Sequence, residues 1–383
     1  MVSSPYYSDT RIFLSPPHLS GEEEARLQEV LDSNYIAPVG PMLERFEADF
    51  CRMTGFADAV ALNSGTAALL LALRGLGVTT GDRVWTSTLT FIGGVTPIVQ
   101  LGAEPVFFDV DPETWTLDPA LLAAELAHAT RQGGLPKVVV PTDLYGQSCD
   151  LDALIALCSP YGVAVVTDSA EAVGSRYRDR AAGKGAAAAA YSFNGNKIIT
   201  TSGGGMLASD NRKLVAQARF LAQQARDPAP HYQHSTLGYN ARLSNVLAGV
   251  GVAQLAVLPQ RVAQRRAVFA RYQAGLADVA GLRLMPEAAW GVSNRWLTVA
   301  QIDPEAFGAS PEQVRLALEA ANIESRPVWK PMHLQPVFAT ARRVGGAVAE
   351  RLFARGLCLP SGSALTTRDI DRIVALIRSL AAA

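Results

Sequence analysis

Short apolar segments alternate with helical patterns through the first half of the chain, and this alternation limits the fold more than any other feature of the sequence. Helical patterns separate most of these segments, and parallel strands need such crossovers. The predicted strands are Ala59–Leu62, Arg83–Ser87, Pro105–Val110, Lys137–Pro141 and Val163–Asp168. We therefore predict an α/β fold whose largely parallel sheet is covered by helices on both faces.

The pattern continues beyond these strands and also indicates where one helix begins. We expect further strands at Ala189–Phe193 and within Gly203–Ser209, followed by a helix over Asn211–Ala225. Near the N-terminus, Ser20 and Glu23 have the three-residue spacing of a capping box. This spacing predicts a helix with Ser20 as its N-cap.

A proline suggests the division into domains. A long helical pattern runs from Leu243 to about Ala280, and Pro259 lies near its middle. Proline removes a helical hydrogen bond, so we expect the helix to break there. A chain of 383 residues is also too long for one ordinary core. We predict a large domain over residues 1–255 and a smaller α+β domain over residues 256–383.

Composition excludes several classes of function. The net charge of −1, without a basic block, gives no support for nucleic-acid binding. The N-terminal segment lacks an apolar core, and no apolar run is long enough to span a bilayer. The four cysteines and five histidines show no spacing typical of a disulfide framework or a metal site. We expect a cytoplasmic protein with free thiols, no metal and no membrane partner.

Two candidate sites follow predicted strands, where α/β sheets bind their ligands. The sequence Ser64-Gly65-Thr66 follows Ala59–Leu62, and small residues at a helix start let backbone N–H groups approach a phosphate. An ordinary helix start explains the same residues equally well. Asp168 ends another strand, where its carboxylate could pair with a protonated ring nitrogen. An N-cap for the next segment is the somewhat favoured alternative when Asp168 is taken alone.

Lys197 is the third candidate, and its surroundings set it apart from the other four lysines. Ser192, Asn194 and Asn196 are compact polar neighbours, and Gly203–Gly205 leave room for a bulky group. A desolvated lysine loses its proton more readily and can form a Schiff base with an aldehyde. Such a lysine would need three partners: a phosphate cradle, an aromatic ring to stack on and an acid facing a ring nitrogen. Pyridoxal phosphate requires all three.

Many segments of the chain resemble the DegT-type (StrS-type) sugar aminotransferases, which are pyridoxal phosphate enzymes of the aspartate-aminotransferase fold (type I). The resemblance runs almost from end to end. The segments that carry it are Tyr35–Glu47, Asn63–Leu69, Gly81–Gly94, Gly102–Pro119, Pro141–Asp150, Thr167–Ser175, Ser192–Lys197, Gly238–Leu255 and Glu324–Phe338. It implies a large, mostly parallel-sheet domain, a small C-terminal domain, and Lys197 as the lysine that holds the cofactor.

The resemblance also implies roles for other cofactor-binding residues. The cofactor phosphate is expected at Gly65 and Thr66, with the Ser192 hydroxyl contributing. Phe91 is expected to stack on the pyridine ring, although a plain core phenylalanine is the alternative. Asp168 is expected to face the pyridine nitrogen and to keep it protonated.

Asn240 is expected to reach the cofactor phosphate of a neighbouring subunit, which implies a homodimer with shared active sites. Glu171 stands near the expected position of the cofactor's phenolic oxygen, where many members of the family have glutamine. Many members also have Gly-Glu-Gly-Gly where this chain has Ser202–Gly205. Both departures resemble the branch that aminates UDP-linked 4-keto-6-deoxy-N-acetylhexosamines.

Charged residues of the segment Glu324–Phe338 are candidates for binding the substrate. Arg326, Lys330 and His333 could meet a nucleotide diphosphate, because cationic side chains suit phosphate oxygens. A surface turn rich in proline is the alternative. For His231 and His234 we expect no role in the site.

The expected function is therefore the transfer of an amino group from L-glutamate to the 4-position of a nucleotide-linked keto sugar. The acceptor implied by the resemblance is UDP-2-acetamido-2,6-dideoxy-4-keto-hexose, for surface-glycan biosynthesis. A dTDP-linked, GDP-linked or 3-keto sugar is the alternative acceptor. Two further alternatives are a sugar dehydratase, which would have histidine in place of Lys197, and a regulatory protein with a vestigial cofactor site.

Overall fold

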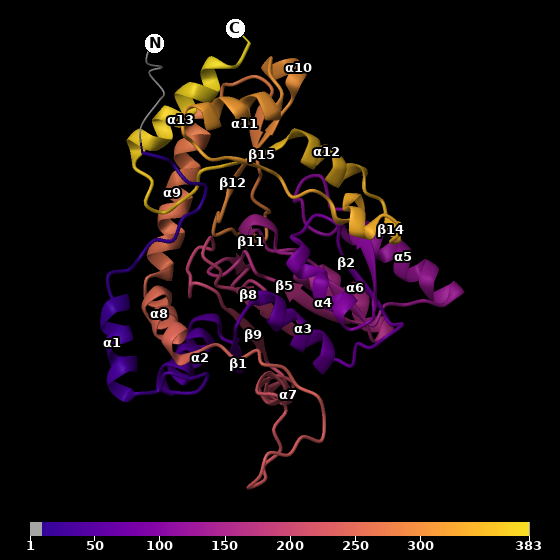
Figure 1. Ribbon diagram of the computed structural model, residues 1–383. Coiled ribbons are helices and arrows are strands. Elements are labelled where there is room, and N and C mark those ends of the chain that lie inside the picture. Colours follow the sequence, from indigo (N-terminus) through magenta and orange to yellow (C-terminus); the bar gives the residue numbers. More distant parts are fainter. Residues whose placement is uncertain (1–9, 383) are drawn as a thin grey trace.

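An eight-stranded sheet forms the centre of the described part of the chain, residues 10–382 of a computed structural model (Figure 1). Its strands, from edge to edge, are β1 (Asp58–Leu62), β9 (Gly205–Ser209), β8 (Ala188–Ser192), β5 (Ala164–Asp168), β4 (Val138–Val140), β2 (Arg83–Ser87), β3 (Glu104–Phe108) and β14 (Arg343–Val344). All pairings are parallel except those of β9, which runs antiparallel to β8 and β1. The predicted largely parallel sheet is confirmed, and each predicted strand lies within two residues of an observed one.

Both faces of this sheet are buried, which explains why its strands are almost continuously apolar. In β4, Val138 and Val140 belong to one apolar cluster and Val139 to another. The first cluster includes Leu69 of α3 (Gly65–Gly75), and the second includes Leu154 of α6 (Leu151–Cys158). Successive side chains of a strand point to opposite faces, so an all-valine strand must pack against helices on both sides.

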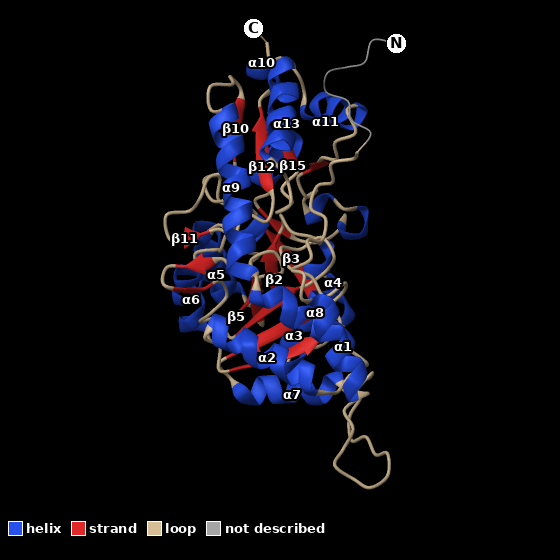
Figure 2. Ribbon diagram, turned by 90° about the vertical axis from the view of Figure 1, so that its left-hand side faces the viewer, coloured by secondary structure: helices blue, strands red, loops and turns tan. Residues whose placement is uncertain are grey.

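Helices follow most of the strands along the chain, as the predicted alternation of strands and helices requires, and they pack on the sheet (Figures 1 and 2). Those that precede the C-terminal part are α1 (Glu23–Ser33), α2 (Pro41–Thr54), α3 (Gly65–Gly75), α4 (Thr96–Gln100), α5 (Pro119–Gln132), α6 (Leu151–Cys158), α7 (Arg212–Ala222) and α8 (Asn245–Ala256). A small antiparallel sheet of β6 (Arg176–Tyr177), β7 (Arg180–Ala181) and β11 (Gly291–Val292) lies beside them.

The C-terminal part has its own four-stranded antiparallel sheet within residues 10–382. Its strands are, in spatial order, β10 (Leu282–Leu284), β12 (Thr298–Ile302), β15 (Gly356–Leu359) and β13 (Arg326–Pro327). The surrounding helices are α9 (Leu258–Leu276), α10 (Pro304–Phe307), α11 (Pro311–Ala320), α12 (Ala347–Arg355) and α13 (Thr367–Ser379). These elements, apart from α12 and β13, supply a separate apolar core to which Ile12 also belongs.

Two segments cross between the parts on either side of residue 255. Ile12 pairs with Ile323 in the C-terminal part, and β14 pairs in parallel with β3 of the large sheet. The predicted division at residues 255/256 stays a prediction. The two pairings show that residue 12, from the N-terminal end, packs with the C-terminal part, and that β14, from beyond residue 255, belongs to the large sheet.

Pro259 stands where the long helical pattern breaks. The chain bends by 60° between α8 and α9, and Pro259 lies in the first turn of α9, where a proline needs no helical hydrogen bond. Among the described residues no single helix is long and apolar enough to cross a membrane. The bent pair of α8 and α9 reaches that threshold only when its two helices are taken together.

The predicted N-cap of the first helix is wrong by two residues. α1 begins at Glu23, and Glu22 occupies the N-cap position without a side-chain cap. The Glu23 carboxylate accepts hydrogen bonds from the backbone N–H groups of Ser20 and Gly21 and from the Gln254 side chain. The spacing therefore reflects a turn that the buried Glu23 carboxylate closes, rather than an N-cap at Ser20.

The prediction of free thiols holds for all four cysteines. None is paired, although Cys51 is only partly buried.

Candidate active site

A cavity of about 290 Å³ opens at the carboxyl ends of the central strands. It is lined by residues that follow four strands of the large sheet. The lining includes Gly65 and Thr66 after β1, Thr90, Phe91, Gly93 and Gly94 after β2, Asp168 and Glu171 at the end of β5, and Ser192, Asn194, Asn196 and Lys197 at the end of β8. Three candidate sites that are far apart in the sequence therefore meet in one cavity.

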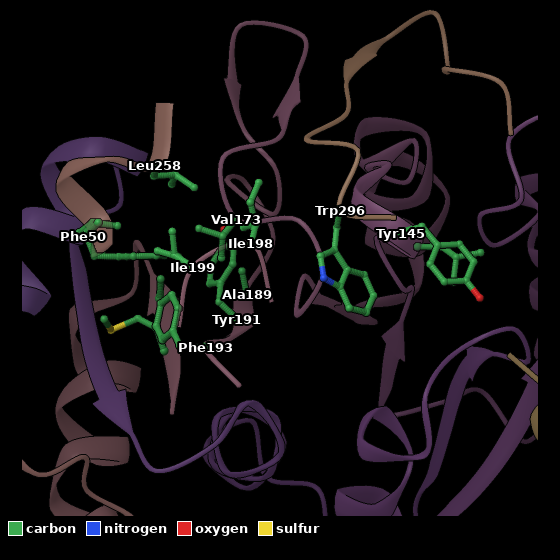
Figure 3. Packing of buried hydrophobic residues seen from close by; sticks show 14 of the residues in the cluster. Phe50, Tyr145, Val173, Ala189, Tyr191, Phe193, Ile198, Ile199, Leu258 and Trp296 are labelled. Carbon is green, nitrogen blue, oxygen red and sulfur yellow. The ribbon is translucent and has the colours of Figure 1, made fainter. Parts of the chain in front are cut away.

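Lys197 is held in this cavity by the residues that follow it. Ile198 and Ile199 are buried in an apolar cluster with Val173, Ala189 and other side chains, as Figure 3 shows. The Lys197 side chain is only 12% exposed, and its Nζ lies 3.9 Å from Glu171 Oε1. The same ammonium lies 4.0 Å from the centre of the Trp296 ring.

The charges in the cavity are coupled. Burial lowers the pKa of Lys197, and the nearby carboxylates of Glu171 and Asp168 partly offset this effect. A lowered pKa makes the neutral amine more accessible, and only the neutral amine can attack an aldehyde. The position of Lys197 therefore suits a lysine that forms a Schiff base.

Asp168 lies buried at the end of β5. Its Oδ1 accepts a hydrogen bond from the Ala170 N–H at 3.2 Å, and burial raises the pKa of this carboxyl. No helix begins in the segment that follows within the described chain, which argues against the N-cap alternative. A buried carboxylate that lines a cavity needs a charged or donating partner there.

Glu171 is fixed by two donors from other parts of the chain. The Tyr145 backbone N–H donates to Oε2 at 2.6 Å, and the Trp329 indole N–H donates to Oε1 at 3.2 Å. Burial raises the pKa of Glu171 to about 7, while Lys197 and the Tyr145 N–H act in the opposite direction. This carboxyl is therefore poised to change its charge near neutral pH.

The N-terminus of α3 forms another wall of the cavity. Ser64 caps the helix by accepting a hydrogen bond from the Ala67 N–H, and Gly65 and Thr66 occupy the first helical positions. Backbone N–H groups at these positions have no partner within the helix and favour an anion. Gly65 packs closely on Ser192: a Cβ atom added to Gly65 would lie 3.0 Å from the Ser192 Cβ. The two interpretations of Ser64-Gly65-Thr66, an ordinary helix start and a phosphate site, are therefore compatible. A capped helix start also presents N–H groups that can bind a phosphate.

Phe91 is not a plain core residue. It is 54% exposed, lines the cavity, and its ring centre lies 5.4 Å from that of Trp329. An exposed aromatic ring at the cavity wall is available to stack on a bound planar group.

Arg326 and Lys330 lie elsewhere, in a neighbouring cavity of about 820 Å³. Asn196, Trp296 and Trp329 line both cavities, so the two adjoin. The second cavity has an apolar wall that includes Phe13, Pro16 and Phe353.

The structure does not bring His333 to either cavity, contrary to the prediction that it binds substrate. Its imidazole is buried, with Nδ1 2.6 Å from the Thr88 hydroxyl and Nε2 3.0 Å from Glu350 Oε1. Both ring nitrogens are occupied by these partners, so the geometry favours a structural role. The proline-rich segment turns this side chain inward, which the sequence did not indicate.

Asn240 is exposed beside the first cavity, and its backbone carbonyl accepts a hydrogen bond from the Asn63 side chain. It follows the long loop between α7 and α8, which extends away from the rest of the molecule in both views (Figures 1 and 2). His231 and His234 lie exposed on this loop, bonded to Gln233 and to the Gln224 carbonyl.

Sequence reasoning missed three aromatic residues of the site: Tyr145, Trp296 and Trp329. Trp329 lies in the segment Glu324–Phe338, which carries part of the family resemblance. Tryptophan is rare in this chain, with five residues, so its presence in that segment was a usable signal. Trp296 is buried and donates its indole N–H to the Asn196 carbonyl. Nothing in its local sequence distinguishes it from an ordinary core tryptophan.

Pyridoxal phosphate fits the residues of the first cavity. The cavity combines a helix N-terminus for a phosphate, a buried carboxylate for a ring nitrogen, an exposed ring for stacking and a buried lysine for an aldehyde. The fit is tight at one wall, because a Cβ atom added to Gly94 would lie 2.4 Å from Asp168 Oδ2. Only glycine at this position leaves the Asp168 carboxylate its space in the cavity.

Comparison with known proteins gives a consistent result. The sequence pattern of the DegT/DnrJ/EryC1/StrS aminotransferase family matches residues 17–378. The chain is 48% identical over 374 residues to EpsN of Bacillus subtilis (strain 168), which is named as a pyridoxal phosphate-dependent aminotransferase; the match covers 97% of this chain and 96% of EpsN. It is 36% identical over 368 residues to a GDP-perosamine synthase of Caulobacter vibrioides, with 96% and 97% covered.

A solved structure is also similar. DesI, crystallised in the presence of its TDP-sugar product, superimposes with a TM-score of 0.90 at 27% identity, and the match covers 98% of this chain and 94% of DesI.

Proposed function

Because the chain belongs to the DegT/DnrJ/EryC1/StrS aminotransferase family and is a pyridoxal phosphate-dependent sugar aminotransferase of the type I fold, we propose that its donor is L-glutamate and its acceptor a nucleotide-linked 4-keto-6-deoxy sugar. The amino group goes to the 4-keto carbon. The proposed acceptor is UDP-2-acetamido-2,6-dideoxy-4-keto-hexose, and the product serves surface-glycan biosynthesis. The observation that carries the proposal is the buried Lys197, 3.9 Å from Glu171, in a cavity that also contains Asp168 and the α3 N-terminus.

The residues of the cavity divide the chemistry between them. Pyridoxal phosphate, when bound, supplies an aldehyde carbon that takes up the amino group of the donor and passes it to the acceptor, and a ring that withdraws electrons. Gly65, Thr66 and the Ser192 hydroxyl bind its phosphate, and Asp168 holds the proton on its ring nitrogen. Lys197 would hold the group through its Nζ, and its amine would move the proton at the amine-bearing carbon.

The second cavity is the proposed site for the nucleotide part of the acceptor. Arg326 and Lys330 bring two cationic groups to its lining, and such groups suit a diphosphate. Lys330 has no carboxylate within ion-pair distance among residues 10–382, whereas Arg326 is paired with Glu324 at 2.9 Å. Aromatic and proline side chains on the same wall suit a base or a sugar ring.

We further propose a homodimer whose active sites include Asn240 of the partner. The loop between α7 and α8 carries two very exposed apolar side chains, Tyr232 at 81% and Leu237 at 84%. Apolar side chains on an extended loop are typical of a surface that another chain covers. Asn240 stands at the base of this loop, at the mouth of the first cavity.

A direct comparison of acceptors tests the proposal. The purified holoenzyme is supplied with L-glutamate and, in turn, the UDP-linked N-acetyl sugar, dTDP-4-keto-6-deoxyglucose and the GDP-linked 4-keto-6-deoxy sugar, and kcat/KM is measured for each. We expect the UDP sugar to be preferred by a factor of about ten or more, because a polar contact to the acetamido group is left unpaired by the other two. The GDP and TDP sugars are the competing acceptors, because one relative is a GDP-perosamine synthase and DesI was crystallised in the presence of its TDP-sugar product.

A better kcat/KM with either competitor would overturn the UDP assignment and leave the aminotransferase activity intact. Glutamate alone should bleach the absorbance of the bound cofactor. Failure of that bleaching would count against glutamate as the donor, and a protein that never takes up cofactor would favour the regulatory alternative.

A further inference from the structure

Trp329 occupies the wall between the two cavities and contacts both. It lines the cofactor cavity beside Glu171 and the second cavity beside Lys330. Its indole N–H donates to Glu171 Oε1 at 3.2 Å. An occupant of the second cavity therefore meets a side chain that is bonded to a carboxylate of the first.

Tyr145 fixes Trp329 and Glu171 at the same time. The Trp329 backbone N–H donates to the Tyr145 hydroxyl at 2.9 Å, and the two rings stack with centres 6.0 Å apart. The Tyr145 backbone N–H donates to Glu171 Oε2 at 2.6 Å. Both oxygens of the Glu171 carboxylate are thus held by one unit, consisting of Tyr145 and Trp329.

The backbone of Tyr145 shows how closely this unit is constrained. Its φ of 52° lies in the left-handed region, which a non-glycine residue adopts only at a cost. That conformation turns the Tyr145 N–H toward Glu171. Such strain persists only where surrounding contacts determine it, and here the contacts are those to Glu171 and Trp329.

Four ionisable groups interact with Glu171 from the elements packed around it. They are Lys197 after β8, Asp168 on β5, Tyr145 after β4 and Cys358 on β15. Burial raises the pKa of Glu171, while the Tyr145 and Trp329 donors oppose that rise. Removal of a donor to the ionised carboxylate should shift its titration to higher pH.

We propose that Trp329 is a positioning residue: through its bond to Glu171 it sets the charge beside Lys197, and it transmits occupation of the second cavity to this pair. The first part depends only on the contacts described above. The second part rests on the proposed function, because the occupant is taken to be a nucleoside diphosphate. Binding of that ligand then changes the protonation of Glu171 and Lys197 before any chemistry occurs.

The test uses the absorbance of the cofactor bound to the holoenzyme, recorded as a function of pH without amino donor. The transition that disappears in Glu171→Gln is assigned to Glu171. We expect this transition to move up by about one pH unit in Trp329→Phe, which keeps an aromatic ring but lacks the indole N–H. Tyr145→Phe should move it less, because the backbone N–H of residue 145 remains.

Trp290→Phe is the matched control. Trp290 likewise donates its indole N–H, in this case to the Ser148 backbone carbonyl, but it lies outside the linings of both cavities. We expect no shift of the transition in this variant. Cofactor affinity and the thermal unfolding midpoint, measured for every variant, show whether each one is folded and loaded. An unchanged transition in a folded, loaded Trp329→Phe protein would overturn the positioning role, as would an equal shift in the control.

A second series adds UDP, whose binding is measured by calorimetry. UDP should shift the transition in the wild type and leave it in place in Trp329→Phe. If UDP binds to the wild type without shifting the transition, the transmission between cavities is wrong. If UDP does not bind at all, the proposed nucleotide site fails, while the comparison of Trp329→Phe with Trp290→Phe still decides the positioning role.

Discussion

At the scale of single residues, the site depends on three ionisable side chains buried in one cavity. Lys197, Asp168 and Glu171 each pay for desolvation, and burial is the largest influence on the pKa of each. Buried charges are expensive unless they are paired or have a function. Here the ammonium is shared between Glu171 and the face of Trp296, so the lysine is stabilised without a tight ion pair.

Replacement of Lys197 by alanine should abolish turnover while leaving cofactor binding. The α3 N-terminus and Asp168 remain, but the amine that we propose to hold the cofactor and to move the proton is lost. Such losses cost several orders of magnitude in rate. Turnover and cofactor affinity are measured beside Lys213→Ala, which removes an exposed lysine on α7. Turnover within tenfold of the wild type would contradict the assignment of Lys197.

Glu171 should make the stability of the protein depend on pH. Its pKa rises from 4.5 to about 7 on folding, so the folded state binds the proton more tightly. The stabilisation from this proton is complete below pH 4.5 and is lost as the pH rises through 7, at a cost of up to about 3 kcal/mol.

Urea unfolding of the cofactor-free protein at pH 5 and pH 8 measures this effect. The free energy of unfolding should fall less between these pH values in Glu171→Gln than in the wild type. Glu24→Gln, an exposed change on α1, serves as the control and should behave as the wild type. Equal falls in all three proteins would show that Glu171 titrates normally.

At the scale of elements, the site is built from the segments that follow the parallel strands. β2, β5 and β8 all end at the same edge of the sheet, so the residues after them converge although they are far apart in sequence. Gly94, in the turn after β2, approaches Asp168 at the end of β5. The shape of the cavity therefore depends on the small side chains of these turns as well as on the catalytic residues.

Gly94→Ala should weaken cofactor binding without unfolding the protein. The added Cβ would lie 2.4 Å from Asp168 Oδ2, so the carboxylate must move from its position. Gly195→Ala is a matched control in the loop that carries Lys197, because the nearest atom to its Cβ would be 3.8 Å away. We expect cofactor affinity to fall about tenfold or more in the first variant only, a loss of about 1.4 kcal/mol. Equal affinities would mean that Asp168 does not contact the cofactor ring.

At the scale of the whole molecule, the two cavities lie where the large sheet meets the C-terminal part. Trp296 and Trp329 come from beyond residue 255 and close a cavity whose other walls come from the large sheet. The long loop between α7 and α8, by contrast, extends away from this body (Figure 2). Its exposed Tyr232 and Leu237 are the apolar side chains on which the proposed dimer rests.

Mixed dimers test whether Asn240 serves the partner's site. Lys197→Ala and Asn240→Ala chains are each impaired alone. If Asn240 acts across the interface, one of the two sites in a mixed dimer has neither defect. Random exchange at a 1:1 ratio makes about half of the dimers mixed, so the mixture should regain about a quarter of the wild-type activity. The activity is measured after subunit exchange, which labelled chains verify. Verified exchange without recovered activity would indicate that each site is built from one chain.

The sequence by itself determined the layout of the sheet and the location of its functional ends. All-apolar strands such as β4 must be buried on both faces, and strand–helix alternation makes the sheet parallel, so Gly65, Asp168 and Lys197 had to lie at one edge. Pro259 likewise marked the break between α8 and α9. These features are local or periodic, and periodicity is visible in a single sequence.

The tertiary structure alone decided which long-range contacts complete the site. His333 was predicted at the substrate but bonds to Thr88 and Glu350, because the direction of a side chain in an irregular segment depends on what packs around it. Trp296, Trp329 and Tyr145 reach Lys197 and Glu171 from distant parts of the chain, and no local pattern encodes such contacts. The charge of Glu171 is likewise set by burial and by two distant donors, and both exist only after the chain has folded.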